Sequence, residues 1–216
     1  AGYVDFSFYG QKKTETPVID SLASVGIRFT DMYSAAPLSS PSRCGLMTGL
    51  HTGHAQVRGN AEVTAPEPEM NIWDYEAAWK DTRLMGQFAL KEGTPTLGTM
   101  MQSAGYKTAI VGKWSLGVPG TESGANNFGF DLAAGCQCQR WAHLYYPPAL
   151  WRNNELIRLE NDLVKPGTNL DKGADPYDEA SYSKYVGRQY APDVMYSEIK
   201  NFVIENSKDP FFVMWT

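Results

Sequence analysis

Apolar residues recur along the chain at helical spacing, and each group is followed by a short apolar run. After Pro17 they occur at i, i+3 and i+4, at Ile19, Leu22 and Ala23. Because proline favours the first turn of a helix and glycine its C-terminal end, this pattern predicts a helix that ends at Gly26. The run Ile27 to Tyr33 predicts a short strand after it.

The same arrangement occurs twice more. A second helix is predicted between Pro95 and Gly105, before the strand-like run Tyr106 to Gly112. A third helix opens at Pro192, and the apolar run Phe211 to Trp215 after it predicts a buried strand. The apolar positions of these two helices are Leu97, Met100, Met101 and Ala104, and Met195, Ile199, Phe202 and Val203. This alternation predicts an α/β fold with a mostly parallel, mixed sheet sandwiched by helices.

Two long segments lack this periodicity. Residues Ala61 to Glu92 and Asn153 to Tyr190 are rich in charge, proline, asparagine and tyrosine. Long irregular segments of a compact domain run over its surface and often bind ligands. We therefore expect two surface excursions with binding roles.

Composition excludes some classes of protein. The formal charge of -5, from 19 basic and 24 acidic residues, argues against a nucleic-acid binder, which normally carries a basic stripe. No apolar run reaches the roughly 18 residues that a membrane span requires. No signal-peptide pattern opens the sequence, so we expect a chain without a membrane span whose signal peptide has been removed.

The sequence offers few metal-binding patterns. Its three cysteines, Cys44, Cys136 and Cys138, are too few for a disulfide scaffold and wrongly spaced for a zinc knuckle, so we expect buried free thiols. His51 and His54 stand three residues apart in a glycine-containing loop without a nearby carboxylate. They make a poor metal pair, and a structural or substrate-rim role is favoured.

The segment Ser34 to Gly49 carries the most chemistry. A small-residue loop with two prolines leads into a short helical pattern, and Ser39 and Arg43 share its first turn. Backbone N–H groups, the positive helix end and a guanidinium favour an anion there. Spacing alone also fits an N-cap Ser39 and a surface Arg43. The residues thus predict an anion site with a candidate hydroxyl nucleophile and leave this alternative open.

The run Ser39-Ser40-Pro41-Ser42-Arg43, followed by Thr48-Gly49, resembles the signature of formylglycine-dependent (type I) sulfatases of the alkaline phosphatase superfamily. That signature is Cys or Ser, any residue, Pro, Ser, Arg, and then Thr-Gly. Further resemblance, in the expected order, covers residues 16–37, 94–117, 126–131 and 209–216. It implies an alkaline-phosphatase-like fold in which residues 1–216 form an incomplete N-terminal catalytic domain, without the C-terminal subdomain.

The resemblance also implies a mechanism. A maturation enzyme would oxidise Ser39 to formylglycine, whose hydrate attacks sulfur while a divalent cation, usually Ca²⁺, polarises the sulfate. Arg43 would hold the nucleophile, and Lys113 would contact the sulfate or its leaving oxygen. Ser39, as formylglycine, would be this chain's one metal ligand. The others would precede Gly2 or lie far downstream, so we expect the printed chain to bind calcium weakly or not at all and to be inactive as a fragment or with Ser39 unmodified.

The chain departs from the family at one motif. The common sequence Gly-Lys-Trp-His-Leu-Gly has Ser115 in place of its histidine. His143 is a candidate replacement, although a core histidine is the alternative. A carbohydrate-sulfatase subgroup shows a similar Cys-Gln-Arg segment, in which Gln139 and Arg140 would read the sugar. The substrate-binding candidates are Gln139, Arg140, His143, Ser115, Arg58 and Asn60.

These features favour a secreted or periplasmic hydrolase of sulfate esters on a sulfated glycan. The aromatic and arginine-rich stretch from Gln139 to Arg152 favours carbohydrate over small aryl sulfates. One alternative is a phosphonate or phosphate ester hydrolase of the same superfamily. Another is a non-catalytic sulfated-glycan-binding protein, suggested by the absent histidine and by an unmodified serine. Ser39 is either a natural serine-type precursor or a replacement of cysteine.

Overall fold

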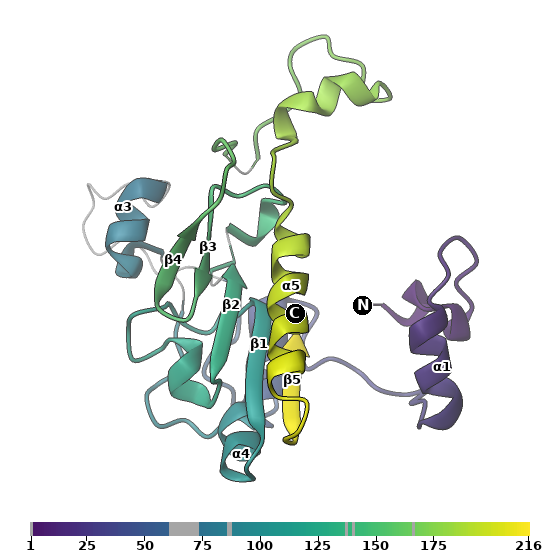
Figure 1. Ribbon diagram of the computed structural model, residues 1–216, viewed down its shortest axis with the longest axis vertical. Helices are drawn as coiled ribbons and strands as arrows, with labels where there is room; N and C mark the ends of the chain where they lie inside the picture. The colour runs from purple at the N-terminus through teal and green to yellow at the C-terminus, as the bar shows by residue number, and fades with distance from the viewer. Residues whose placement is uncertain (1, 61–73, 86–87, 137, 140, 166) are drawn as a thin grey trace. The chain divides into compact units, whose positions relative to one another are not determined.

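The computed structural model describes residues 2–60, 74–85, 88–136, 138–139, 141–165 and 167–216 (Figure 1). The chain divides into two compact units, residues 1–34 and residues 35–216. Each unit is described by itself below.

The first unit contains one helix, α1 (Pro17–Val25), and two single 3₁₀ turns, η1 (Tyr3–Asp5) and η2 (Ser7–Tyr9), within its described residues. Thr16 joins them, because its hydroxyl accepts from the Ser7 N–H at 3.0 Å and donates to Asp20 at 2.9 Å. The predicted helix and its end at Gly26 are confirmed.

The predicted strand Ile27 to Tyr33 is wrong. Residues 27–33 have no regular secondary structure, and Ile27 is 84% exposed. A strand forms only where a neighbour accepts its backbone hydrogen bonds. No described strand of the first unit lies beside this run, so its apolar residues remain in contact with solvent.

The second unit is built on a five-stranded mixed sheet in the order β4-β3-β2-β1-β5 (Figure 1). Strand β1 (Lys107–Lys113) is parallel to both β2 (Leu132–Cys136) and β5 (Phe211–Trp215). Strand β3 (Ala149–Arg152) is antiparallel to β2, and β4 (Glu155–Arg158) is antiparallel to β3. The expected mixed sheet is confirmed, with its parallel part around β1.

Helices cover both faces of this sheet. Helix α5 (Ala191–Glu205) lies beside β1 and packs Phe202 against Ala109 and Val111 (Figure 1). Because neighbouring residues of a strand point to opposite faces, Ile110 points the other way, into a core with Cys44 and Met47 of α2 (Ser39–Thr48). Helix α4 (Leu97–Ser103) also contacts β1.

Strand β5 differs from the prediction of a buried strand. It is the edge of the described sheet, and Phe211 and Trp215 are 40% and 59% exposed. An apolar run of this kind indicates a strand inside a sheet, whereas an edge strand has a neighbouring strand on one side only and is less covered.

The first predicted surface excursion is partly wrong. Residues 61–73 and 86–87 lie outside the described residues, but α3 (Tyr75–Lys80) and the 3₁₀ helix η3 (Thr82–Met85) bury apolar side chains. Trp79 packs against Trp141 with ring centroids 5.2 Å apart. In contrast, no described residue from 152 to 190 is buried, which confirms the second excursion.

Two glycines allow close packing at the C-terminal end of β1, because Gly112 leaves room for Thr216 and Gly135 leaves room between β2 and β1. Gly112 and Gly135 stand opposite each other in the register, with φ of 119° and 122°. A Cβ at Gly135 would collide with the backbone oxygen and nitrogen of Gly112. Neither position accepts a side chain without displacing the strand that ends at Lys113.

Replacing Gly135 therefore tests this close approach. We expect Gly135→Ala to lower the free energy of unfolding by more than about 2 kcal/mol, because it combines backbone strain with a clash. Urea unfolding followed by circular dichroism measures the loss. Gly173 also has a positive φ, of 87°, but nothing lies within 4 Å of its added Cβ. Gly173→Ala should cost only the strain of about 1 kcal/mol, and equal losses in the two variants would contradict the clash.

Candidate active site

Ser39 and Arg43 share the first turn of α2, as predicted. Leu38 is the N-cap residue and Ser39 is the first helical residue, so the alternative of an N-cap serine is wrong. The Ser39 Oγ accepts a hydrogen bond from Arg43 Nε at 3.2 Å. Both side chains are partly buried, so Arg43 is not a free surface residue.

Arg43 connects this turn to the sheet. Its Nη1 donates to the carbonyl oxygen of Lys113 at 2.6 Å, across 70 positions of sequence. Burial lowers the pKa of Arg43, and among the described residues no carboxylate pairs with it. A desolvated cation without a counter-charge is costly and favours an incoming anion.

Lys113 is the last residue of β1 and adds a second cation. Its pKa is lowered by burial and, to a lesser extent, by the positive charge of Arg43. Its backbone is fixed by Thr216, whose hydroxyl accepts from the Lys113 N–H and donates to its carbonyl, both at 2.9 Å. Two interacting cations thus lie in a chain whose net charge is -5.

Two of the predicted substrate-binding residues, Asn60 and Gln139, are hydrogen-bonded to the first turn of α2. Asn60 accepts from the Ser40 N–H at 2.9 Å, and Gln139 accepts from the Ser40 hydroxyl at 3.1 Å. Ser42 N–H donates within the helix, to Leu38. Since Pro41 has no N–H, Arg43 offers more donors to an anion than the backbone of this turn does.

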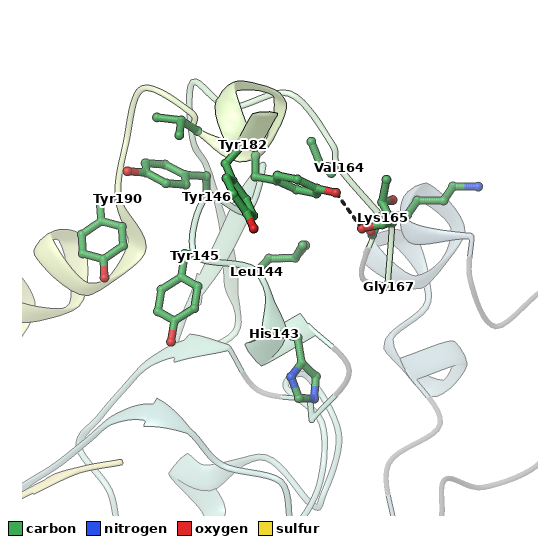
Figure 2. Close-up of a pocket in the computed structure, with 12 residues that line it drawn as sticks. His143, Leu144, Tyr145, Tyr146, Val164, Lys165, Gly167, Tyr182 and Tyr190 are labelled. Atoms are coloured by element: carbon green, nitrogen blue, oxygen red, sulfur yellow. Dashed lines mark hydrogen bonds between the residues drawn. The ribbon is translucent and has the colours of Figure 1, made fainter. Parts of the chain in front are cut away.

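The remaining substrate candidates are dispersed. His143 is exposed and lines a cavity, so the core-histidine alternative is wrong (Figure 2). Arg58 is exposed, and its Nε donates to the carbonyl of Ala55. Ser115 is fully buried, has φ of 56°, and its hydroxyl has no hydrogen-bond partner in the described part of the chain. Arg140 lies outside the described residues.

The described residues do not form a metal site. No group of three or more His, Cys, Asp or Glu that could hold an ion occurs among them. His51 and His54 are exposed, and His51 Nδ1 accepts from the Gly53 N–H. All three cysteines are buried and free, as predicted, and burial raises the pKa of Cys136 to about 12, which keeps it a thiol. No described helix is long and apolar enough to cross a membrane.

The whole chain is similar to proteins of one known family. A family model described as Sulfatase matches residues 1–216. The chain belongs to the sulfatase family. The N-acetylgalactosamine-6-O-sulfatase of Bacteroides thetaiotaomicron is 30% identical over 188 residues, which cover 86% of this chain and 31% of that protein. Human arylsulfatase D is 32% identical over 139 residues, covering 62% of this chain and 21% of that protein.

A solved structure confirms the fold of this sulfatase. The crystal structure of Ps i-CgsB matches with a TM-score of 0.67 at 23% sequence identity, over 100% of this chain and 42% of that one. The expected alkaline-phosphatase-like α/β fold is therefore confirmed. The chain spans about a third of the length of the bacterial relative, at 31%.

Two residues that no sequence pattern singles out, Ser40 and Thr216, shape the candidate active site. Ser40 occupies the variable position of the motif, and its contact with Gln139 spans 99 positions. Thr216 fixes Lys113 across 103 positions. No local pattern indicates either contact, although a small residue in the motif's variable position is compatible with the close packing there.

The lowered pKa of Lys113 predicts that its charge destabilises the fold. We expect Lys113→Met to raise the Tm by about 2–4 °C at pH 7, because it removes a desolvated cation and keeps the apolar stem. The loss of folding stability caused by the Lys113 charge is complete below the lowered pKa of Lys113 and disappears above its ordinary value of 10.5. The Tm difference between variant and wild type should therefore shrink as pH rises through this window.

Thermal unfolding by circular dichroism at pH 7 and pH 10 measures this effect. Lys107 begins the same strand and is exposed, so Lys107→Met is the matched control and should leave the Tm nearly unchanged. A lower Tm for Lys113→Met would mean that the ammonium stabilises the fold.

Proposed function

We propose that this protein hydrolyses sulfate esters on carbohydrates, with Ser39 as the precursor of the nucleophile. One observation carries the proposal: Arg43, a partly buried cation without a carboxylate partner in the described part of the chain, donates from Nε to the Ser39 hydroxyl at 3.2 Å and interacts with the charge of Lys113. A sulfate ester supplies the negative charge that these cations lack.

Ser39 would act after oxidation to formylglycine by a maturation enzyme. The hydrated aldehyde supplies an oxygen nucleophile that a serine hydroxyl replaces poorly. Arg43 would hold this group in place, as its Nε holds the Ser39 Oγ, and its remaining N–H groups would face the sulfate oxygens. Nucleophile and anion would then be oriented by the same guanidinium.

Lys113 would stabilise the leaving oxygen. As the ester bond breaks, negative charge develops on the sugar oxygen, and a nearby ammonium lowers the energy of that state. The lowered pKa of Lys113 also makes proton donation to this oxygen easier. Its position is fixed by the hydrogen bonds that Thr216 makes with its backbone.

A carbohydrate substrate is supported by the bacterial relative, whose name specifies N-acetylgalactosamine 6-O-sulfate. Gln139 is held at the start of α2 by a hydrogen bond from the Ser40 hydroxyl. The exposed His143 follows four residues later in the sequence. We propose that both contact the sugar, together with Asn60, Arg58 and Arg140. Ser115 stays among the candidates because its buried hydroxyl lacks a partner within the described residues.

The family resemblance also suggests calcium, a place in the periplasm or outside the cell, and a role for residues 1–216 as the N-terminal part of the catalytic domain. These remain proposals. Within the described residues no group of three or more His, Cys, Asp or Glu could hold the ion.

The nucleophile is tested in the full-length protein from its native host. We expect its Ser39 peptide to be lighter by two hydrogens in mass spectra, which identifies formylglycine. Ser39→Ala should lower kcat for N-acetylgalactosamine 6-sulfate by at least about a thousandfold, because no other residue replaces the nucleophile. Ser103→Ala, at an exposed position near the end of α4, is the matched control.

Two results would contradict this reading. Faster hydrolysis of the matched 6-phosphate than of the 6-sulfate would favour a phosphate ester hydrolase. An unmodified Ser39 without turnover would favour a glycan-binding protein, since the Arg43 and Lys113 pair could still bind a sulfate group.

Arg43→Lys tests the shared guanidinium. A lysine has one nitrogen and cannot reproduce both the contact with Ser39 Oγ and that with the Lys113 carbonyl. We expect kcat to fall about 10- to 100-fold with the fold intact by circular dichroism. Sulfate release measures this loss, and an unchanged kcat would mean that charge alone suffices.

A further inference from the structure

A cavity of about 470 Å³ opens beyond the 3₁₀ helix η5 (Trp141–His143), and Figure 2 shows aromatic rings gathered around it. Small-molecule sites typically occupy about 300–1,000 Å³ and combine apolar walls with a few polar groups. The aromatic walls of this tyrosine cavity are His143, Tyr145, Tyr146, Tyr182, Tyr185 and Tyr190.

Three of these rings lie against one another, and two of them are stacked. Tyr145 and Tyr190 lie nearly parallel, with centroids 5.9 Å apart and planes at 16°, and Tyr146 adjoins Tyr190 at 5.4 Å. Tyr145 is 64% exposed. A tyrosine has an apolar face and a polar hydroxyl edge. This suits a pyranose ring, which also has apolar C–H faces and hydroxyl edges.

The other walls are held before any ligand arrives. The Tyr182 hydroxyl donates to the Pro176 carbonyl at 2.8 Å, and the Tyr185 hydroxyl donates to the Thr168 carbonyl at 2.9 Å. The Asn161 side chain makes four hydrogen bonds to the backbone of Pro147, Arg188 and Gln189. Walls fixed in this way lose little conformational entropy on binding.

The charge of the lining favours an anionic glycan. Although the chain has 24 acidic and 19 basic residues, no carboxylate is among the described residues that line the cavity. His143 and Lys165 contribute the basic groups. A sulfated saccharide would therefore meet no like charge there.

The cavity begins close to the candidate active site along the chain. Gln139 is hydrogen-bonded to Ser40, next to Ser39, and His143 lies four residues after Gln139. Four residues span at most about 14 Å between Cα atoms. Sugar rings in the active site and in the cavity could thus belong to one oligosaccharide.

We propose that the tyrosine cavity is a second carbohydrate subsite, which binds a neighbouring ring of the oligosaccharide whose sulfate is removed at Ser39. The proposal rests on the proposed function and adds that the substrate is an oligosaccharide. Stacking on Tyr145 and Tyr190 supplies affinity, and the tyrosine hydroxyls bind the edge of the sugar.

The test uses the full-length protein and a tetrasaccharide that ends in N-acetylgalactosamine 6-sulfate. We expect Tyr145→Ala to weaken calorimetric binding of the desulfated tetrasaccharide about tenfold, since truncating a buried contact of an aromatic ring costs this much. The ratio of kcat/KM for the sulfated tetrasaccharide to that for the monosaccharide should fall to the same extent. Tyr145→Phe keeps the ring and should retain most of the binding.

Tyr177→Ala is the matched control, because Tyr177 is 96% exposed and does not line the cavity. Equal binding by the Tyr145→Ala and Tyr177→Ala proteins, or no binding of the tetrasaccharide by the wild type, would overturn the subsite. Binding that depends on Tyr145 without any turnover would uphold the subsite and overturn the proposed hydrolysis. Turnover without binding that depends on Tyr145 would uphold the proposed hydrolysis and overturn the subsite.

Discussion

The Arg43 guanidinium is the contact on which the geometry of the site depends. It joins the first turn of α2 to the end of β1 by donating to the Ser39 hydroxyl and to the Lys113 carbonyl. Removing a guanidinium from water is costly, and within the described residues no carboxylate offsets that cost. The apolar packing of α2 on the sheet, through Cys44 and Met47, must therefore hold the cation in place. The desolvated Arg43 thus lowers the stability of the fold and leaves a positive charge available to an anion.

The hydrogen bond from Arg43 to the Lys113 carbonyl depends on how β1 ends. Gly112 precedes Lys113, and a Cβ there would collide with the backbone of Thr216. Without a side chain at Gly112, Thr216 comes close enough to bond both backbone groups of Lys113. Gly135 allows the same approach from β2. The two glycines thus allow the packing that fixes the backbone at the end of β1. This packing also fixes the Lys113 carbonyl, which accepts the hydrogen bond from Arg43.

The elements that could be predicted from sequence are those with local signals. Proline and glycine mark both ends of α1, and helix α5 with its following strand has a clear apolar period. The wrong predictions concern neighbours that sequence does not reveal. The run 27–33 lacks a strand partner among the described residues of its unit, and the apolar side chains of residues 78–85 are buried in a cluster with Trp141 and Trp151. For the site, the motif indicated Ser39 and Arg43, whereas the role of Ser40 depends on a contact 99 positions away.

The replacement of the motif histidine is explained in part by how the site handles charge. Ser115 stands directly after Trp114 in a fully buried position with a left-handed backbone, and a neutral hydroxyl costs less to bury there than a charged imidazolium. In the proposed hydrolysis the leaving sugar oxygen would need a proton, and Lys113 would supply it more readily because burial and, to a lesser extent, the charge of Arg43 lower its pKa. The same burial and repulsion that destabilise the charged Lys113 in the folded protein would thus favour proton release to that oxygen.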